Sequence, residues 1–276
     1  MVVYAVAADQ SIIRIFLAGF LPGFLLMALF SGYIIWWSLR NPDKVPAADP
    51  PSTFLEKIKQ SGNLIPCGAL IVFVCWVLIA GYATATECAA YGVAGSLALA
   101  LWSRSLTWGN FWEGLMGTTR TSCMIMFILA GAAFLTKTMA FTGIPRELAD
   151  WVNSMQLSPM ALIAVLTVVY LILGTALDGI SMIVLTSAVV LPMIQKAGFD
   201  LIWFGIFIVL LVEIAEVTPP VGFNLFVLQN MTGKDSNTIA KAAIPFFMCL
   251  VICIVLITVF PQIVTYLPDV VMGADK

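Results

Sequence analysis

Residues 161–194 read ALIAVLTVVYLIL (161–173), GTALDG (174–179) and ISMIVLTSAVVLPMI (180–194), so two apolar arms flank a short polar break. The arms hold 13 and 15 residues, whereas a helix needs about 20 apolar residues to cross a bilayer. Paired short apolar segments around Gly and an acid are typical of re-entrant hairpins. The sequence therefore predicts a helical hairpin in the membrane. The distribution of Lys and Arg is compatible with a hairpin tip that stops halfway through the bilayer and with one that crosses it. The short arms favour a tip that stops halfway.

A second break follows, where VEIAEVTPPVG (212–222) separates LIWFGIFIVLL (201–211) from FNLFVL (223–228). Its two prolines lack N–H donors and disfavour helical geometry in the residues before them. Gly222 then lets the backbone fold tightly. This pattern predicts a discontinuous helix whose unwound segment exposes carbonyl groups at membrane depth, as a Na⁺ site requires. The alternative is a proline-kinked helix whose acids face partner helices.

Composition places nearly the whole chain in a membrane. Of its 276 residues, 61% are hydrophobic and 10% are charged, compared with about 45–50% and about 25% in soluble domains. The net charge is −2, whereas a nucleic-acid-binding protein usually carries a basic patch. The chain contains no His, which excludes Ser-His nucleophiles, His-ligated metals and His proton relays. The six cysteines lack any CxxC spacing, and we interpret them as small buried hydrophobes.

The remaining apolar runs predict a polytopic, all-α membrane protein. Membrane-spanning helices are expected at 12–39, 64–82, 85–103, 121–141 and 244–266. Three other segments are expected outside the bilayer core: a polar connection at 40–63, an aromatic interfacial segment at 102–120 and a short surface helix at 142–154.

Four acids lie at or near membrane depth, where ionisable residues are functional candidates by default. Thr84 and Glu87 have the spacing of a capping box, so a structural role at a helix start is expected for this pair. Asp178 suits an N-cap. If the hairpin tip lies at the membrane midplane, Thr175, Asp178 and Ser181 would instead offer oxygens to a cation. Both readings of Asp178 remain open.

Glu213 and Glu216 are three residues apart, on one face of a helix. Two carboxylates cannot both remain ionised and unpaired in a medium of low dielectric constant. Protonation, a bound cation or an aqueous cavity must resolve the conflict.

The sequence gives little support to an enzymatic function. The G-x-x-x-D spacing at 174–178 differs from the Gly-x-Gly-Asp of intramembrane aspartyl proteases, and no plausible second catalytic Asp accompanies it. No Walker-type phosphate loop occurs in the sequence, which excludes ATP drive from this chain. We therefore predict that the protein is not an enzyme.

Several stretches, taken together and in order, resemble the large membrane subunit of tripartite ATP-independent periplasmic (TRAP) transporters, over its C-terminal two-thirds. The stretches are SIIRIFLAGFLPG (11–23), GYATATECAAYG (81–92), TGIPRELADWV (142–152), LGTALDGISMIVLTSAVVLPMIQKAGFDLIWFG (173–205), EIAEVTPPVGFNLFVLQNMTG (213–233) and FPQIVTYLP (260–268). The match runs in the same order over nearly the whole chain.

The resemblance implies a multi-pass protein of the bacterial inner membrane that carries out Na⁺-coupled symport of a small organic acid. It implies an elevator-type fold, of which this chain holds the second inverted repeat, with a re-entrant hairpin and a discontinuous helix. The implied partners are a small four-helix membrane subunit, a periplasmic substrate-binding protein and the lipid bilayer. The corresponding division of the chain is into scaffold-like helices at 1–141, a transport-type region at 142–240 and a final helix and tail at 241–276.

The resemblance also implies roles for residues near the two breaks. The candidate Na⁺ ligands are Gly174, Thr175, Asp178, Thr218, Pro219 and Gly222. The candidate substrate contacts are Ser181, Glu216 and Asn224.

The chain departs from the family pattern at Ala85, where Pro is usual, at Ala215, where Gly is common, and at Glu216, where an apolar residue is common. The family's subunit is also roughly half as long again, and its first hairpin has no counterpart here. A site formed between two repeats is then incomplete, so we expect no transport by this chain alone. The alternative function is a non-transporting membrane scaffold or assembly subunit.

Overall fold

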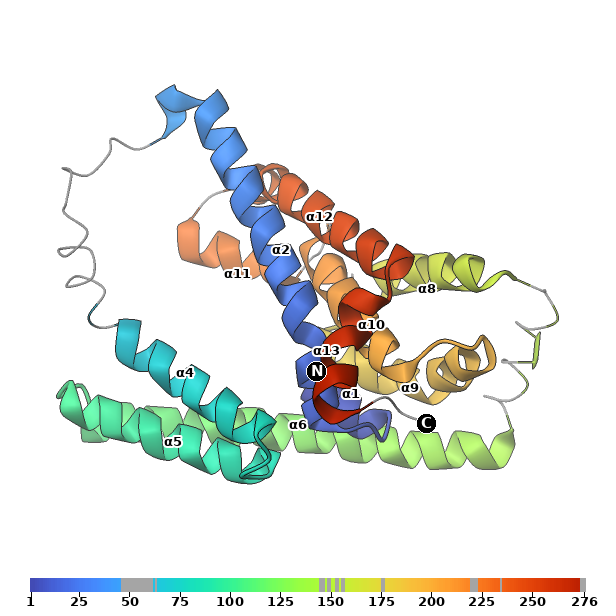
Figure 1. The fold of residues 1–276 in the computed structure, drawn as a ribbon, viewed down its shortest axis with the longest axis horizontal. Coiled ribbons are helices and arrows are strands. Elements are labelled where there is room, and N and C mark those ends of the chain that lie inside the picture. Colours follow the sequence, from blue (N-terminus) through green and yellow to red (C-terminus); the bar gives the residue numbers. More distant parts are fainter. Residues whose placement is uncertain are drawn as a thin grey trace. The chain divides into compact units, whose positions relative to one another are not determined.

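The computed structural model describes residues 1–45, 62, 64–143, 147, 150–151, 154, 157–174, 177–218, 223–233 and 235–273. Within these residues the regular structure is helical and contains no β-strand (Figure 1). The elements are α1 (Val2–Ala7), α2 (Ile12–Arg40), a 3₁₀ turn (Pro42–Lys44), α4 (Leu64–Ile79), α5 (Ala85–Trp102), α6 (Trp108–Thr142), α8 (Pro159–Leu173), α9 (Gly179–Lys196), α10 (Leu201–Val217), α11 (Phe223–Thr232), α12 (Ser236–Val259) and α13 (Gln262–Met272).

Four helices in the described part of the chain are long and apolar enough to cross a membrane. These segments are Ile12–Arg40, Trp108–Leu135, Gly179–Lys196 and Asn237–Val259. The chain is therefore an all-α, multi-pass membrane protein. Many large apolar side chains are exposed, including Phe127 and Phe141, as expected of helix faces that contact lipid.

The chain divides into two compact units, one comprising Met1–Trp36 with Ile125–Lys276 and the other Trp37–Met124. In the second unit α4 packs against α5. The helices approach closely at Gly95, where an added Cβ would lie 2.3 Å from Leu70 Cδ1. The functional division at 141 and 240 concerns roles in transport, and it stays a prediction.

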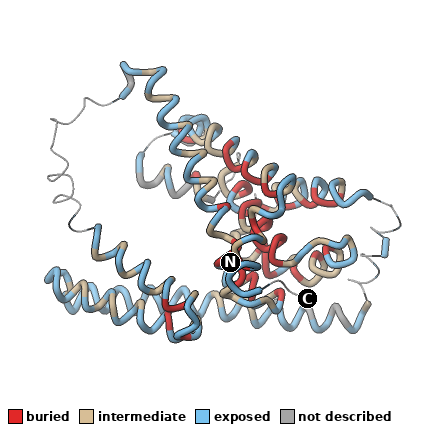
Figure 2. The backbone as a smooth tube through the Cα atoms, viewed as in Figure 1, coloured by how far each residue is buried: buried red, intermediate tan, exposed pale blue. Residues whose placement is uncertain are grey.

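Helix α10 is the centre of the larger unit, because α8, α9, α11, α12 and α13 all contact it. Figure 2 shows buried positions following α10 and the helices around it. The Trp203 ring stacks on Phe199 and Phe207, with centroid distances of 5.2 and 5.3 Å. Its Nε1–H donates to the Ile257 carbonyl oxygen at 2.8 Å. Since Trp203 is 3% exposed, this bond fixes α10 to the end of α12 inside the protein.

Trp203→Phe should lower the free energy of unfolding by about 1–2 kcal/mol, because it leaves a buried carbonyl without its donor. The substitution keeps an aromatic ring in the stack. Thermal unfolding in detergent would measure the effect. Phe199→Leu, which removes a stacking ring but no hydrogen bond, is the matched control. A Trp203→Phe melting temperature equal to that of the parent chain would contradict the role given to this bond.

The two hairpin arms are helices, as predicted, and α9 is longer than its apolar core. It runs for 18 residues, from Gly179 to Lys196, or roughly 27 Å at the usual helical rise. The arms are joined by a hydrogen bond between the hydroxyls of Tyr170 on α8 and Thr186 on α9. Thr186 also donates to the Met182 carbonyl oxygen, so Tyr170 is the donor between the arms. Where the hairpin tip stops in the membrane stays a prediction.

Two boundaries predicted from the sequence are wrong. Most of the expected interfacial segment at 102–120 and the expected span at 121–141 form one continuous helix, α6, which begins at Trp108. No proline interrupts it, and the hydroxyls of Thr118 and Thr119 bond back to carbonyls one turn earlier. The expected last span at 244–266 is two helices, α12 and α13. Pro261, which has no N–H to continue the α12 ladder, stands between them.

The three other expected spans, 12–39, 64–82 and 85–103, correspond to the helices α2, α4 and α5. Most of the polar connection at 40–63 and of the expected surface helix at 142–154 lies outside the described residues.

Candidate functional site

The tip of the α8–α9 hairpin is capped at both helix ends by its own residues. Helix α8 ends at Leu173, and Gly174 is its C-cap. Asp178 is the N-cap of α9, and its Oδ2 accepts from the Ser181 N–H at 3.1 Å. The Ser181 hydroxyl donates to Asp178 Oδ1 at 2.5 Å. Asp178 and Ser181, to which the family resemblance gives different roles, one with Na⁺ and one with substrate, are therefore partners in the same cap.

Two glycines let this tip lie directly on the C-terminal half of α10. A Cβ added to Gly174 would lie 2.3 Å from Ala215 Cβ and 3.1 Å from Ala215 Cα. A Cβ added to Gly179 would lie 2.5 Å from Val212 Cγ1. Real Cβ atoms do not approach other carbons this closely, so only glycine fits at either position without movement. Val212 and Ala215 are thus the surface on which the hairpin tip rests.

Glu216 links three elements at this contact. Its Oε1 accepts from the backbone N–H of Gly179, the first residue of α9, at 2.8 Å. Its Oε2 accepts from Asn224 Nδ2 on α11 at 3.2 Å. A single carboxylate at the end of α10 therefore holds both the start of α9 and the start of α11.

These bonds decide which charge the tip favours. The N-terminus of a helix carries a partial positive charge and free N–H groups, which together attract anions. At α9, Glu216 and Asp178 already accept from the N–H groups of Gly179 and Ser181. Because the chain's own carboxylates take these donors, the end of α9 is not an open anion site. The two carboxylates at the start of α9, Asp178 and Glu216, also repel an approaching anion.

The second break lies beside the tip. Helix α10 ends at Val217, and its C-cap, Thr218, is extended with φ −79° and ψ 125°. The Thr218 hydroxyl donates to the Ile214 carbonyl oxygen at 2.6 Å, so lone pairs on its oxygen remain available. Helix α11 begins at Phe223, which agrees with the predicted discontinuous helix. Thr175, Pro219 and Gly222 lie outside the described residues.

The donor chemistry of this region suits a hard cation. Its polar groups are carboxylate, hydroxyl and amide oxygens with backbone carbonyls at a helix end, and oxygen is the ligand that alkali and alkaline-earth ions prefer. No group of three or more His, Cys, Asp or Glu side chains suited to a metal ion occurs among the described residues. Asp178 is hydrogen-bonded to Ser181, and Glu216 to Asn224. The Thr218 hydroxyl, in the part of the chain that the structure describes, bonds within its own helix.

Two sequence candidates lie elsewhere. The Thr84 N–H donates to Glu87 Oε2 at 2.7 Å and the Glu87 N–H to Thr84 Oγ1 at 3.4 Å, a reciprocal cap at the start of α5. Glu213 lines a pocket between α2, α10, α11 and α12. Sequence reasoning missed Gly179, Val212 and Ala215 as contact residues. The one available signal was the small residue at 215, which stands where the family commonly has Gly.

The fold and the packed helix breaks define an all-helical, multi-pass membrane protein. Comparison with known proteins gives the family. The family model of the tripartite ATP-independent periplasmic transporter, DctM component, matches residues 1–263. The chain therefore belongs to the large-permease family of TRAP transporters.

Three relatives illustrate the range of the family. The C4-dicarboxylate TRAP transporter large permease protein of Pseudomonas aeruginosa is 30% identical over 98% of this chain and 62% of its own length. The sialic acid TRAP transporter permease protein of Haemophilus influenzae is 26% identical over 99% of this chain and 44% of its length. The ectoine/5-hydroxyectoine TRAP transporter large permease protein of Ruegeria pomeroyi is 25% identical over 98% of this chain and 62% of its own length. The chain thus spans less than two-thirds of the length of these relatives.

Proposed function

We propose that the chain is a membrane subunit of a secondary active transporter, in which Na⁺ drives symport of a small organic acid. The transporter would lie in a bacterial inner membrane and work with a periplasmic binding protein and a small four-helix membrane subunit. Relatives named for C4-dicarboxylates, sialic acid and ectoine support a small organic acid as cargo. Since the chain covers 62% of the Pseudomonas relative, transport would need the part that this chain does not supply.

The observation that carries the proposal is the packing of two helix breaks: the hairpin tip, at Gly174 and Gly179, lies against the end of α10, at Ala215 and Glu216. Backbone carbonyls, Asp178 and Thr218 would supply oxygen ligands to Na⁺, together with Thr175, Pro219 and Gly222. Ser181, Glu216 and Asn224 would border the cargo. An elevator movement of this region, taken from the family resemblance, would carry ion and cargo together.

Sodium binding can be tested on the chain itself. Hydrogen exchange of the purified protein in lipid nanodiscs, compared in NaCl and in KCl, should show Na⁺-specific protection of amides around 177–182 and at 218. Asp178→Asn should raise the Na⁺ concentration required for this protection at least tenfold. Ser158→Ala, which removes a similar N-cap at the far end of α8, is the matched control. Equal exchange in the two salts would reject the Na⁺ site.

A non-transporting scaffold or assembly subunit is the second candidate function. The contacts of Glu216 favour it, because both carboxylate oxygens already accept hydrogen bonds from the chain. In that case Glu216→Gln would lower thermal stability or assembly with partner subunits. Na⁺ would leave amide exchange unchanged in both the parent and the variant, which distinguishes the scaffold from the transporter.

A further inference from the structure

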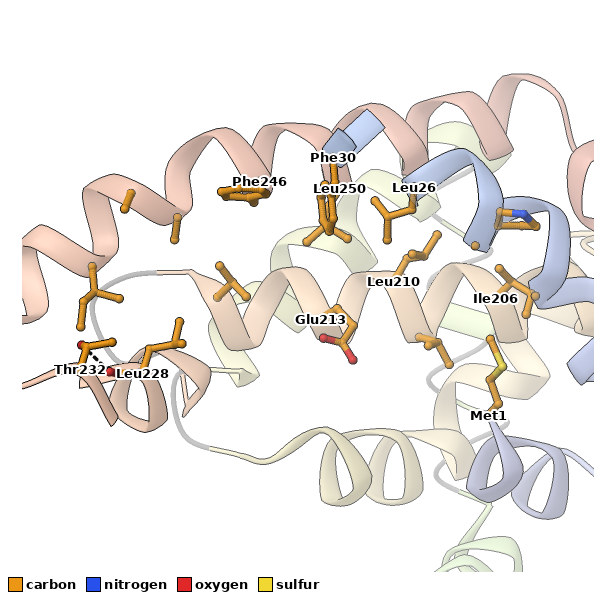
Figure 3. A pocket seen from close by; sticks show the side chains of 18 of the residues that line it. Met1, Leu26, Phe30, Ile206, Leu210, Glu213, Leu228, Thr232, Phe246 and Leu250 are labelled. Atoms are coloured by element: carbon orange, nitrogen blue, oxygen red, sulfur yellow. Dashed lines mark hydrogen bonds between the residues drawn. The ribbon is translucent and has the colours of Figure 1, made fainter. Parts of the chain in front are cut away.

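A pocket of about 800 Å³ lies within the larger unit, apart from the hairpin tip. Its walls come from α2, α10, α11 and α12, and apolar side chains such as Leu26, Phe30, Leu210 and Phe246 make up most of them (Figure 3). Small-molecule sites in proteins usually have volumes of about 300–1,000 Å³ and mainly apolar walls. The pocket therefore has the size and surface of a site for an organic ligand.

Glu213 is the one acidic side chain among the described residues that line the pocket. It is exposed to the pocket, whereas its helix neighbours Val212 and Ile214 are buried. Figure 3 shows it projecting from α10 between Met1 on one side and Leu228 with Thr232 on the other. The structure shows no hydrogen bond or ion pair to its carboxylate within the described part of the chain. This distinguishes Glu213 from Glu216, whose two oxygens both have donors.

A carboxylate in apolar surroundings is stabilised by a positive ligand, which compensates for its lost hydration. A bare metal ion fits poorly, because it needs several oxygen ligands and Glu213 is the only carboxylate in the described lining. An organic cation, by contrast, needs one counter-charge and an apolar surface for its body.

We propose that this pocket binds a lipophilic organic cation, with the positive group against Glu213 and the apolar body against α2 and α12. None of the described lining residues of this pocket is a proposed Na⁺ ligand or cargo contact, and the proposal does not depend on transport. Such a ligand would bridge α2, α10 and α12, so its binding would stiffen the core of the larger unit. The site is a place where a cationic amphiphile would regulate or inhibit the protein.

The test compares two probes of the same size and shape and opposite charge, tetraphenylphosphonium and tetraphenylborate. Equilibrium binding of each radiolabelled ion is measured on the purified chain in phosphatidylcholine nanodiscs, after subtraction of empty nanodiscs. The parent chain should bind one tetraphenylphosphonium saturably and should show no saturable binding of tetraphenylborate. Glu213→Gln should weaken the cation's binding at least tenfold, and Glu213→Asp should retain most of it.

Two further variants keep the result interpretable. Glu113→Gln changes an exposed acid of α6 outside the pocket and should bind as the parent does. Ala243→Trp fills the pocket but keeps Glu213, and it should abolish binding. Equal binding of the two probes, or undiminished binding by either Glu213→Gln or Ala243→Trp, would overturn the proposal. If Glu213→Gln fails to fold, Glu213→Asp and Ala243→Trp still decide it.

Discussion

Gly174→Ala is expected to destabilise the protein by about 2–3 kcal/mol, the cost of inserting a methyl group where the packing leaves no room. The added carbon would lie 2.3 Å from Ala215 Cβ and 3.1 Å from Ala215 Cα. Because one of these atoms belongs to the α10 backbone, a side-chain rotation cannot relieve the overlap. The hairpin tip would have to move away from α10. Thermal unfolding in detergent or nanodiscs would measure the loss.

A second substitution makes this prediction specific to the contact. Ala215→Gly removes the nearer atom and should by itself cost about 1 kcal/mol, the usual penalty for Gly inside a helix. In the double variant the two costs should be less than additive, because the methyl group of Gly174→Ala gains the space that Ala215 vacates. Strict additivity would show that the tip does not rest on residue 215. Gly114→Ala, on α6 with open space around its Cβ position, is the matched control.

Glu216→Ala is expected to increase hydrogen exchange at the Gly179 amide about 30-fold, which corresponds to about 2 kcal/mol. The variant removes the acceptor 2.8 Å from this N–H, and it removes the charge that favours the positive end of α9. Glu216→Gln keeps an acceptor without the charge and should have a smaller effect. Exchange measured by mass spectrometry with short peptides over 177–182 would resolve the change.

The partner of Glu216 on α11 offers an independent check. Asn224→Ala removes the 3.2 Å bond to Oε2 but leaves Oε1 on Gly179, so exchange at Gly179 should rise much less than in Glu216→Ala. Glu113→Ala on α6 should leave it unchanged. If Glu216→Ala left the exchange of Gly179 at its parent value, the proposed link between α9 and α11 would be wrong.

Much of the architecture follows from the order of residues alone. Hydropathy places the membrane helices because lipid offers the backbone no hydrogen-bond partner, which favours helices that satisfy their own N–H and C=O groups. GTALDG and VTPPVG mark the two breaks because proline and glycine act on the chain locally. Caps follow in the same way, since Thr84 with Glu87 and Asp178 with Ser181 lie within one turn of each other. At α6 the composition changes near residue 120 although the helix continues. After α12 the apolar composition continues although the helix ends at Val259.

The role of Glu216 could not be read from the sequence. Their spacing places Glu213 and Glu216 on one helical face and suggests similar surroundings for the two carboxylates, but in the tertiary structure their surroundings differ. Glu216 meets the N–H of a residue 37 positions away in the chain, whereas Glu213 faces an apolar pocket. Sequence determined the helices, breaks and caps, because these depend on neighbours along the chain. Only the packing of α9 and α11 on α10 decided which acid is bonded and which is available, because that depends on contacts between distant segments.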